Sequence, residues 1–274
     1  MMTVSLSLRQ RALTLAVLFA GSLALAGCGS GVDPSHRRSM RSGGGGLASA
    51  PPRAPKPSEA LDYSKRFSVH GIDVSKYQGP IDWNAVAASD VQFAWIKATE
   101  GADHLDSRFA TNWAGAKAAG VPRGAYHFVY WCRPWRQEMA WFKQVVPVER
   151  DALPPVLDVE ATPESRTCKR RLTPEEAIPE MRAMLADMES HYGKKPIIYV
   201  TVDFYQAILA DHELDDYPIW IRSTKHHPSV KYGGRNWTFW QYQSDGRVSG
   251  INAKIDRNVF KGSVAEWNAW LKAN

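Results

Sequence analysis

The chain of 274 residues is long enough for one large domain or two small ones, and its 44% hydrophobic content is that of a protein with a sizeable core. Its formal charge of +6 comes without a long run of Lys and Arg interleaved with aromatics. This pattern argues against nucleic-acid binding and favours contact with an anionic polymer of the cell envelope. Eleven tryptophans offer both core filling and flat faces for ligands such as sugars.

Residues 1–28 have the layout of a secretory signal. Arg9 and Arg11 precede a run of apolar and small residues over 12–26, which is too short for a comfortable membrane span. The run ends in LAGC, which resembles a bacterial lipobox whose cysteine, Cys28, becomes the lipidated first residue of the mature protein. We therefore predict export and a membrane anchor at Cys28, the alternative being a chance cysteine after small residues. The glycine at position 29 favours the outer membrane, facing the periplasm, if the host has one.

Residues 29–66 have the composition of a disordered tether. They contain GGGG, SAPPRAPKP and scattered Arg and Ser, with almost no large apolar side chains. Such a segment cannot bury enough surface to offset the entropy lost on ordering. Extended at about 3.3 Å per residue, it would reach on the order of 100 Å. We therefore predict a folded domain over residues 67–274 that reaches the cell wall from a membrane.

Short β-rich runs alternate with helical ones from residue 69 onward. The predicted strands are Val69–Val74, Val91–Ala98, Gly124–Tyr130, Pro154–Glu160, Lys195–Thr201, Tyr217–Arg222, Thr238–Gln243 and Ala253–Asp256. The first five are continuous apolar stretches, which is typical of a parallel sheet covered on both faces. The predicted helices are Trp83–Ser89, Ser107–Ala119, Trp135–Val146, Thr173–Tyr192 and Val202–Ala210. For the fourth helix, Thr173 and Glu176 predict a capping box, and Pro179 predicts a kink or a delayed start.

This alternation predicts an α/β fold, an irregular TIM-like (β/α) barrel with eight strands and fewer than eight helices. In such barrels the chemistry collects at the carboxyl ends of the strands. Four of the eight predicted strands end in acids, which random surface placement would not produce. The polar residues at predicted strand ends are Asp73, Glu100, His127, Asp158, Glu160, Arg222, Gln241 and Asp256.

The motif PPVLDVE places Asp158 and Glu160 two residues apart on one strand. Their side chains then project from the same face, roughly 6 to 7 Å apart. Neighbouring acids push each other's proton affinities apart, so such a pair can supply the protonated acid and the ionised carboxylate that glycoside hydrolysis requires. We expect Asp158 to stay charged and Glu160 to hold the proton. The spacing leaves retaining, inverting and substrate-assisted routes open.

Other kinds of site find little support in the chain. His226 and His227 are adjacent and point apart, and there is no HExxH, CxxC or GxSxG pattern. A satisfied core histidine is at least as good an interpretation of His127 as a ligand-binding one. We therefore expect no metal and no cofactor.

Several motifs occur in collinear order between Val69 and Phe260, namely HGIDVSKYQGPIDW, FAWIKATEG, GAYHF, PPVLDVE, PIIYV and WQYQSDGRVSGINAKIDRNVF. Together they resemble glycoside hydrolase family 25, the lysozyme-type muramidases. The resemblance implies a barrel of the β5α3 type and cleavage of peptidoglycan at the β-1,4 bond after N-acetylmuramic acid. It places the catalytic acid on Glu160 and its partner on Asp158, with Asp73 and Asp256 as further rim carboxylates. The implied substrate-binding residues are Tyr126, Trp220 and Gln241, to which we add Glu100 and His127 at strand ends.

The chain also departs from the family's usual pattern. It continues as WIRSTKHHPS from Trp220, and it carries WCRPW after the third predicted strand and a loop around Cys168. Cys132 and Cys168 remain once Cys28 is set aside, and in an oxidising compartment we predict a disulfide between them, the alternative being free buried thiols. Two other functions stay open: a non-catalytic wall-binding lipoprotein on the same fold, and a hydrolase of another amino-sugar polymer such as chitin. We expect a monomer.

Overall fold

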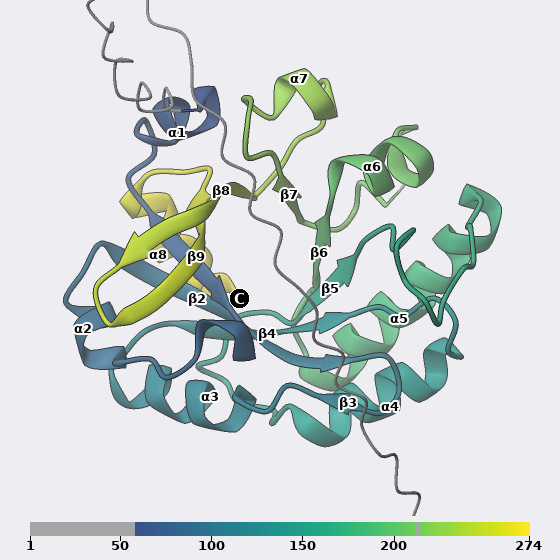
Figure 1. Cartoon of the computed structure of the whole chain (residues 1–274), viewed down its shortest axis with the longest axis horizontal. Coiled ribbons are helices and arrows are strands. Elements are labelled where there is room, and N and C mark those ends of the chain that lie inside the picture. The colour runs from purple at the N-terminus through teal and green to yellow at the C-terminus, as the bar shows by residue number, and fades with distance from the viewer. Residues whose placement is uncertain (1–57, 212–213) are drawn as a thin grey trace, which may run out of the picture. The chain divides into compact units, whose positions relative to one another are not determined.

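The computed structural model describes residues 58–211 and 214–274 (Figure 1). The predicted signal, Cys28 and most of the predicted tether lie outside these residues. In the described part the strands join into one sheet in the order β1-β9-β8-β7-β6-β5-β4-β2-β3, and β1 also pairs with β2. The sheet is therefore a closed barrel of eight strands, with β3 (His104–Leu105) attached outside it. The barrel strands are β1 (His70–Val74), β2 (Val91–Glu100), β4 (Arg123–Phe128), β5 (Val156–Val159), β6 (Ile197–Val200), β7 (Ile219–Arg222), β8 (Phe239–Val248) and β9 (Ile251–Phe260).

The direction of the strands explains how the barrel closes. All neighbouring pairs from β1 through β2 and β4 to β8 are parallel, whereas β9 runs antiparallel to both β8 and β1. A tight turn at Gly250 joins β8 to β9, so this connection needs no crossover helix. Gly250 has a φ of +90°, and a Cβ there would lie 2.4 Å from the carbonyl oxygen of Asp82. The predicted irregular barrel is confirmed, with the antiparallel β9 as its irregular strand.

All five predicted helices are present in the described residues. They are α2 (Trp83–Ala87), α3 (Phe109–Ala118), α4 (Trp135–Val145), α5 (Pro174–Tyr192) and α6 (Val202–Phe204), the last continuing as a π-helical turn over Tyr205–Leu209. Three further segments, α1 (Glu59–Ser64), α7 (Ser229–Tyr232) and α8 (Val264–Ala273), bring the α-helical segments of the described residues to eight, so the helices are not fewer than eight as expected. In α5 the capping box of Thr173 and Glu176 forms. The helix begins at Pro174, so Pro179 does not delay its start. No helix in the described ranges is long and apolar enough to cross a membrane.

The predicted tether does not extend to residue 66, because helix α1 and its cap at Ser58 already belong to the folded unit. The side chain of Ser58 accepts a hydrogen bond from the backbone N–H of Leu61 and so caps this helix. Ala60 is fully buried, and its N–H donates to the carbonyl of Lys225 at 3.2 Å. The ring of Tyr63 lies 4.9 Å from that of His227. A helix of only six residues lacked a clear periodic signal, but capping and packing include residues 58–66 in the folded unit.

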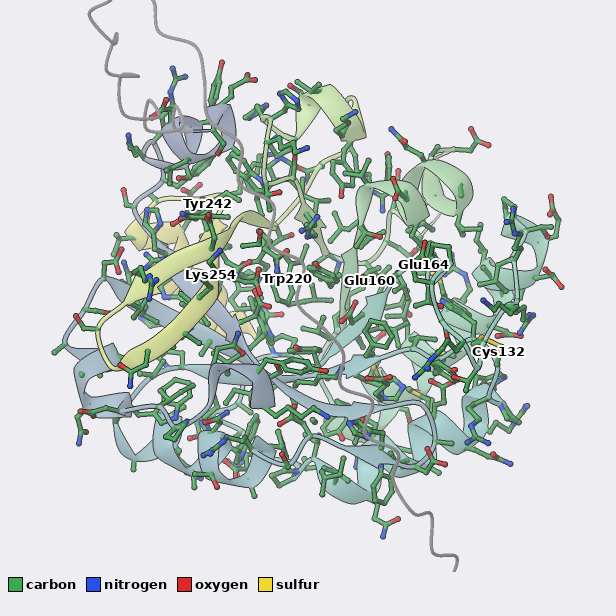
Figure 2. All side chains as sticks on the ribbon, viewed as in Figure 1. Cys132, Glu160, Glu164, Trp220, Tyr242 and Lys254 are labelled. Carbon is green, nitrogen blue, oxygen red and sulfur yellow. A yellow bond between two sulfur atoms is a disulfide. The ribbon has the colours of Figure 1, made fainter. Side chains whose placement is uncertain are left out.

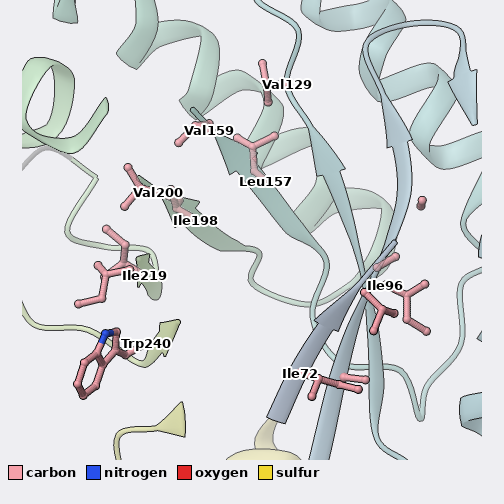
Figure 3. Close-up of a cluster of buried hydrophobic side chains, with 14 of the residues drawn as sticks. Ile72, Ile96, Val129, Leu157, Val159, Ile198, Val200, Ile219 and Trp240 are labelled. Carbon is pink, nitrogen blue, oxygen red and sulfur yellow. The ribbon is translucent and has the colours of Figure 1, made fainter. Parts of the chain in front are cut away.

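The core has two parts, one on each side of the sheet. The larger lies between the strands and the helices and includes Ile72, Ile96, Leu157 and Ile198 (Figure 3). The smaller fills the barrel with aromatic rings: Trp95 on β2 and Trp220 on β7 lie 4.8 Å apart, although their strands are not neighbours. Glycine makes room for these rings, since a Cβ at residue 71 would lie 2.3 Å from the Phe93 ring. These rings form a solid floor beneath the carboxyl ends of the strands.

Candidate active site

A cleft of about 630 Å³ opens where the parallel strands end. Figure 2 shows Glu160 and Trp220 near the centre of the barrel. The lining residues come from most barrel strands, so the cleft depends on closure of the whole sheet. Among them are seven residues predicted from the sequence: Asp73, Tyr126, Asp158, Glu160, Trp220, Gln241 and Asp256.

The two acids of the DVE motif differ in burial. Asp158 lies within β5, flanked by Phe128 on β4 and Tyr199 on β6, and it is 6% exposed. Its Oδ1 has no hydrogen-bond partner among the described residues. Glu160 follows the last residue of β5 and is partly exposed. Glu160 is therefore the member of the pair that a ligand in the cleft can reach more easily.

Asp73 and Asp256 face each other across the seam where β1 meets β9. This pairing follows from the antiparallel register, in which directly opposite residues project from the same face of the sheet. Both acids line the cleft. Residues distant in sequence thus complete a four-carboxylate site with Asp158 and Glu160.

Two amides hold Asp73 in place. Its Oδ2 accepts hydrogen bonds from Nδ2 of Asn258 at 2.7 Å and from Nε2 of Gln241 at 3.0 Å. Trp220 Nε1 donates to the Asn258 side-chain oxygen at 2.9 Å, and the Tyr199 hydroxyl donates to that of Gln241 at 3.0 Å. With both amide oxygens occupied by donors, both amide nitrogens point at the carboxylate. The predicted sugar contacts Trp220 and Gln241 therefore also have a structural role.

Burial raises the pKa of all four carboxyls. It raises the pKa of Asp73 to about 6, against the lowering effect of its two amide hydrogen bonds. Burial, followed by the nearby charge of Asp73, raises the pKa of Asp256 to about 8. The pKa of Asp158 is raised well above its usual range by burial and by the charge of Glu160. The pKa of Glu160 is raised by burial and lowered by Arg222 and Lys97.

The pKa is raised for both Asp158 and Glu160, so the expectation that Asp158 stays charged while Glu160 holds the proton stays a prediction. Asp158 is the more deeply buried acid, and its free Oδ1 receives no donor from the described residues. Arg222 and Lys97 favour the charged form of Glu160, and Lys97 also favours the charged form of Asp158. One proton shared by the two carboxyls would relieve the repulsion between their charges.

Two cations for which the sequence predicted no catalytic or substrate-binding role also belong to the site. Lys97 and Arg222 line the cleft, the first on β2 and the second at the end of β7. Lys97 Nζ lies 2.7 Å from a carboxylate oxygen of Glu100 and 4.8 Å from the ring centre of Phe128. Arg222 was among the polar residues at predicted strand ends, and this position at the rim of the barrel was the sequence feature that could have indicated a place in the site.

Two predicted substrate-binding residues do not line the cleft. His127 is fully buried, with Nε2 2.9 Å from Oε2 of Glu138 and Nδ1 2.7 Å from the Thr99 hydroxyl. It is a satisfied core histidine, because its side chain projects to the helix side of β4. Glu100 lines a separate hollow of about 500 Å³ and reaches the cleft only through its ion pair with Lys97.

A disulfide braces the loops beside Glu160. Cys132 and Cys168 are bonded in the structure, with their Cα atoms 5.6 Å apart. The bond ties the segment after β4 to the loop after β5. Trp131, next to Cys132, donates from its indole N–H to the backbone carbonyl of Glu160 at 3.2 Å. Residues 58–211 and 214–274 contain no group of three or more His, Cys, Asp or Glu side chains that could hold a metal ion.

Comparisons with known proteins agree with this geometry. Residues 72–251 match Glycosyl hydrolases family 25. The chain is 36% identical over 222 residues to the uncharacterised protein YegX of Escherichia coli K12, covering 79% of this chain and 78% of that protein. It is 36% identical over 211 residues to lysozyme M1 of Streptomyces globisporus, covering 72% and 69%. A family 25 glycosyl hydrolase from Bacillus anthracis superposes with a TM-score of 0.69 at 38% identity, covering 74% of this chain and 94% of that one.

Proposed function

The chain belongs to glycosyl hydrolase family 25, and we propose that it is a muramidase that cleaves the β-1,4 bond between N-acetylmuramic acid and N-acetylglucosamine in peptidoglycan. The observation that carries this proposal is the four-carboxylate cleft with Glu160 at its accessible edge. A glycosidase needs one protonated carboxyl for the leaving oxygen and negative charge near the developing oxocarbenium ion. The cleft supplies both within one closed site.

Glu160 is the acid in this proposal, and Asp158 is the reservoir of its proton. A saccharide that covers Glu160 removes the water around its carboxylate, which raises its pKa and favours transfer of the shared proton from Asp158. Glu160 then protonates the glycosidic oxygen as the bond to the anomeric carbon breaks. Asp158, now ionised, stabilises the positive charge at the sugar ring together with Asp73, until the oxygen of a water molecule bonds to the anomeric carbon and the proton that this water releases returns to the carboxylates. The aromatic side chains of Tyr126 and Trp220 line the same cleft and would contact sugar faces.

We expect Glu160→Gln to lower the rate of peptidoglycan cleavage by about a thousandfold, because the amide keeps the shape and loses the proton. The full chain is incubated with purified peptidoglycan, and the released fragments are identified by mass spectrometry. Fragments from the parent chain should end in a reducing N-acetylmuramic acid. Glu164→Gln is the matched control, since Glu164 is an exposed acid in the loop that follows and does not line the cleft.

Three outcomes would contradict parts of this proposal. Full activity of the Glu160→Gln variant would remove Glu160 as the acid. A reducing-end N-acetylglucosamine would show that the other glycosidic bond is cut. Binding of the parent chain to sacculi without any release would favour the non-catalytic wall-binding alternative.

We also infer that the protein is exported as a monomeric lipoprotein anchored at Cys28, in the outer membrane where the host has one. The lipobox sequence LAGC supports the anchor. The Cys132–Cys168 disulfide supports export, because such bonds persist in oxidising compartments. Peptidoglycan lies in the same space, within reach of a tethered domain.

A further inference from the structure

A second groove continues the cleft on the far side of Glu160. It measures about 610 Å³, and Glu160 and Ala161 line both hollows. In Figure 2, Glu164 and Cys132 lie on the side of Glu160 away from Trp220. The apolar lining comes from Trp131, Leu172, Phe204, Ala207 and Ile208, and the basic lining from Lys169, Arg170 and Arg171.

The groove is fixed to the backbone of the proposed acid. Trp131 donates to the carbonyl of Glu160 and stacks on Phe204, with ring centres 5.4 Å apart and planes 12° from parallel. Arg170 Nη1 donates to the carbonyl of Trp131 at 3.0 Å. The disulfide at Cys168 then holds the basic residues that follow it against this floor. The groove is therefore built into the site and keeps its position relative to Glu160.

Two of the cations in the groove are available to a ligand. Arg170 is neutralised by Glu180 at 3.2 Å and lies 3.7 Å from Glu176. Lys169 and Arg171 are exposed, and neither has a side-chain partner among the residues that the structure describes. The surrounding loop, residues 164–171, has four basic residues and one acid. The groove thus combines an apolar floor with unneutralised positive charge.

We propose that this groove binds the carboxylate-bearing stem peptide of peptidoglycan, with Lys169 and Arg171 as specificity residues. The proposal rests on the muramidase function proposed above. A stem peptide is attached to the lactyl ether of N-acetylmuramic acid, close to the glycosidic oxygen that Glu160 would protonate. The peptide must therefore pass near Glu160. Its alanine methyl groups match the apolar floor, and its carboxylates match the two cations. Continuity with the cleft favours this peptide over an anionic polymer that is not joined to the scissile sugar.

Binding is measured first, in the full chain carrying Glu160→Gln so that the ligand survives. The probes are a fluorescent tetrasaccharide muropeptide and the same saccharide after an amidase has removed its peptides. Lys169→Ala/Arg171→Ala should weaken binding of the peptide-bearing probe about fivefold and leave the stripped probe unchanged. The control pair is Arg150→Ala/Lys272→Ala, which removes the same charge from exposed residues that do not line the groove. Equal affinities for the peptide-bearing probe in variant and parent would overturn the proposal.

Kinetics with Glu160 intact provide the second measurement. Lys169→Ala/Arg171→Ala should raise KM for intact peptidoglycan about fivefold, leave kcat unchanged, and leave both constants unchanged on amidase-stripped glycan strands. An equal rise on both substrates would assign the cations to the sugar chain and overturn the proposal. Competition by poly(glycerol phosphate) but not by free stem peptide would do the same in favour of a phosphate polymer. A binding difference in a chain that cleaves neither substrate would retain the groove and reject the muramidase function.

Discussion

Asp73 shows how single side chains set the protonation of the cleft. Burial favours its neutral form, and the amides of Asn258 and Gln241 favour its charged form. The two effects bring its pKa to about 6. Loss of either amide hydrogen bond should therefore change the pKa of Asp73, and with it the net charge of the cleft near pH 6. The amide of Asn258 is the closer of the two.

Asn258→Ala should shift the acidic limb of the pH profile of kcat/KM to higher pH. Loss of a hydrogen bond that lowers the pKa of Asp73 lets that pKa rise further, and Asp73 stabilises positive charge only when ionised. Activity rises as Asp73 ionises, so the limb must move upward in pH. Asn252→Ala on the exposed part of β9 is the control and should leave the profile in place. An unchanged or downward-shifted limb for Asn258→Ala would mean that Asp73 does not set it.

Two connections between elements determine the shape of the site. The tight β8–β9 turn lets β9 run back antiparallel and close against β1, which places Asp256 opposite Asp73. The disulfide joins the loops after β4 and β5, on either side of Glu160. The first connection is made by backbone pairing between β8 and β9, with three shifts in register along it. The second depends on one covalent bond and is open to a direct test.

Cys132→Ser/Cys168→Ser should lower the free energy of unfolding by about 3 kcal/mol, because the bond closes a loop across a sequence separation of 36 residues. Urea denaturation of the full chain measures this loss. The barrel should still form, since neither cysteine lies in a strand, and KM for peptidoglycan should rise as the groove loosens. Cys28→Ser serves as the cysteine control and should leave unfolding unchanged. A double variant as stable as the parent would show that the loops are held by their other contacts alone.

At the scale of the whole molecule, the folded unit begins earlier than its composition indicates. Helix α1 packs against the segment after β7 through Ala60 and Tyr63. The predicted tether is therefore shortened to residues 29–57, with an extended reach of roughly 95 Å at about 3.3 Å per residue. Such a reach would still let the domain contact the wall from the proposed lipid anchor.

Cys28→Ser should move the protein from the membrane fraction to the soluble fraction of the cell envelope, because the proposed lipid anchor is attached at that cysteine. Fractionation and metabolic labelling with a fatty acid measure the change. Cleavage of purified peptidoglycan by the variant should match the parent, since the cleft lies in the folded unit. Continued lipid labelling of the variant would reject Cys28 as the anchor.

The sequence by itself determined the barrel strands and seven of the residues that line the cleft, the four carboxylates of the site among them. Apolar runs ending in acids are local signals, and parallel strands present their carboxyl ends at one rim, so Asp158, Glu160 and Asp73 could be placed there. Collinear motifs added the family. These features depend on chain direction and on residue type, which the sequence contains directly.

Only the tertiary structure decided which of these residues act together. The direction in which His127 projects, the docking of α1 and the amide contacts of Asn258 arise from packing between distant segments. The pKa values of Asp158 and Glu160 are raised by burial and held down by Lys97, which reaches the cleft from another strand. Solvation and charge act through space, so the pKa values of these acids depend on side chains that only the closed barrel brings together.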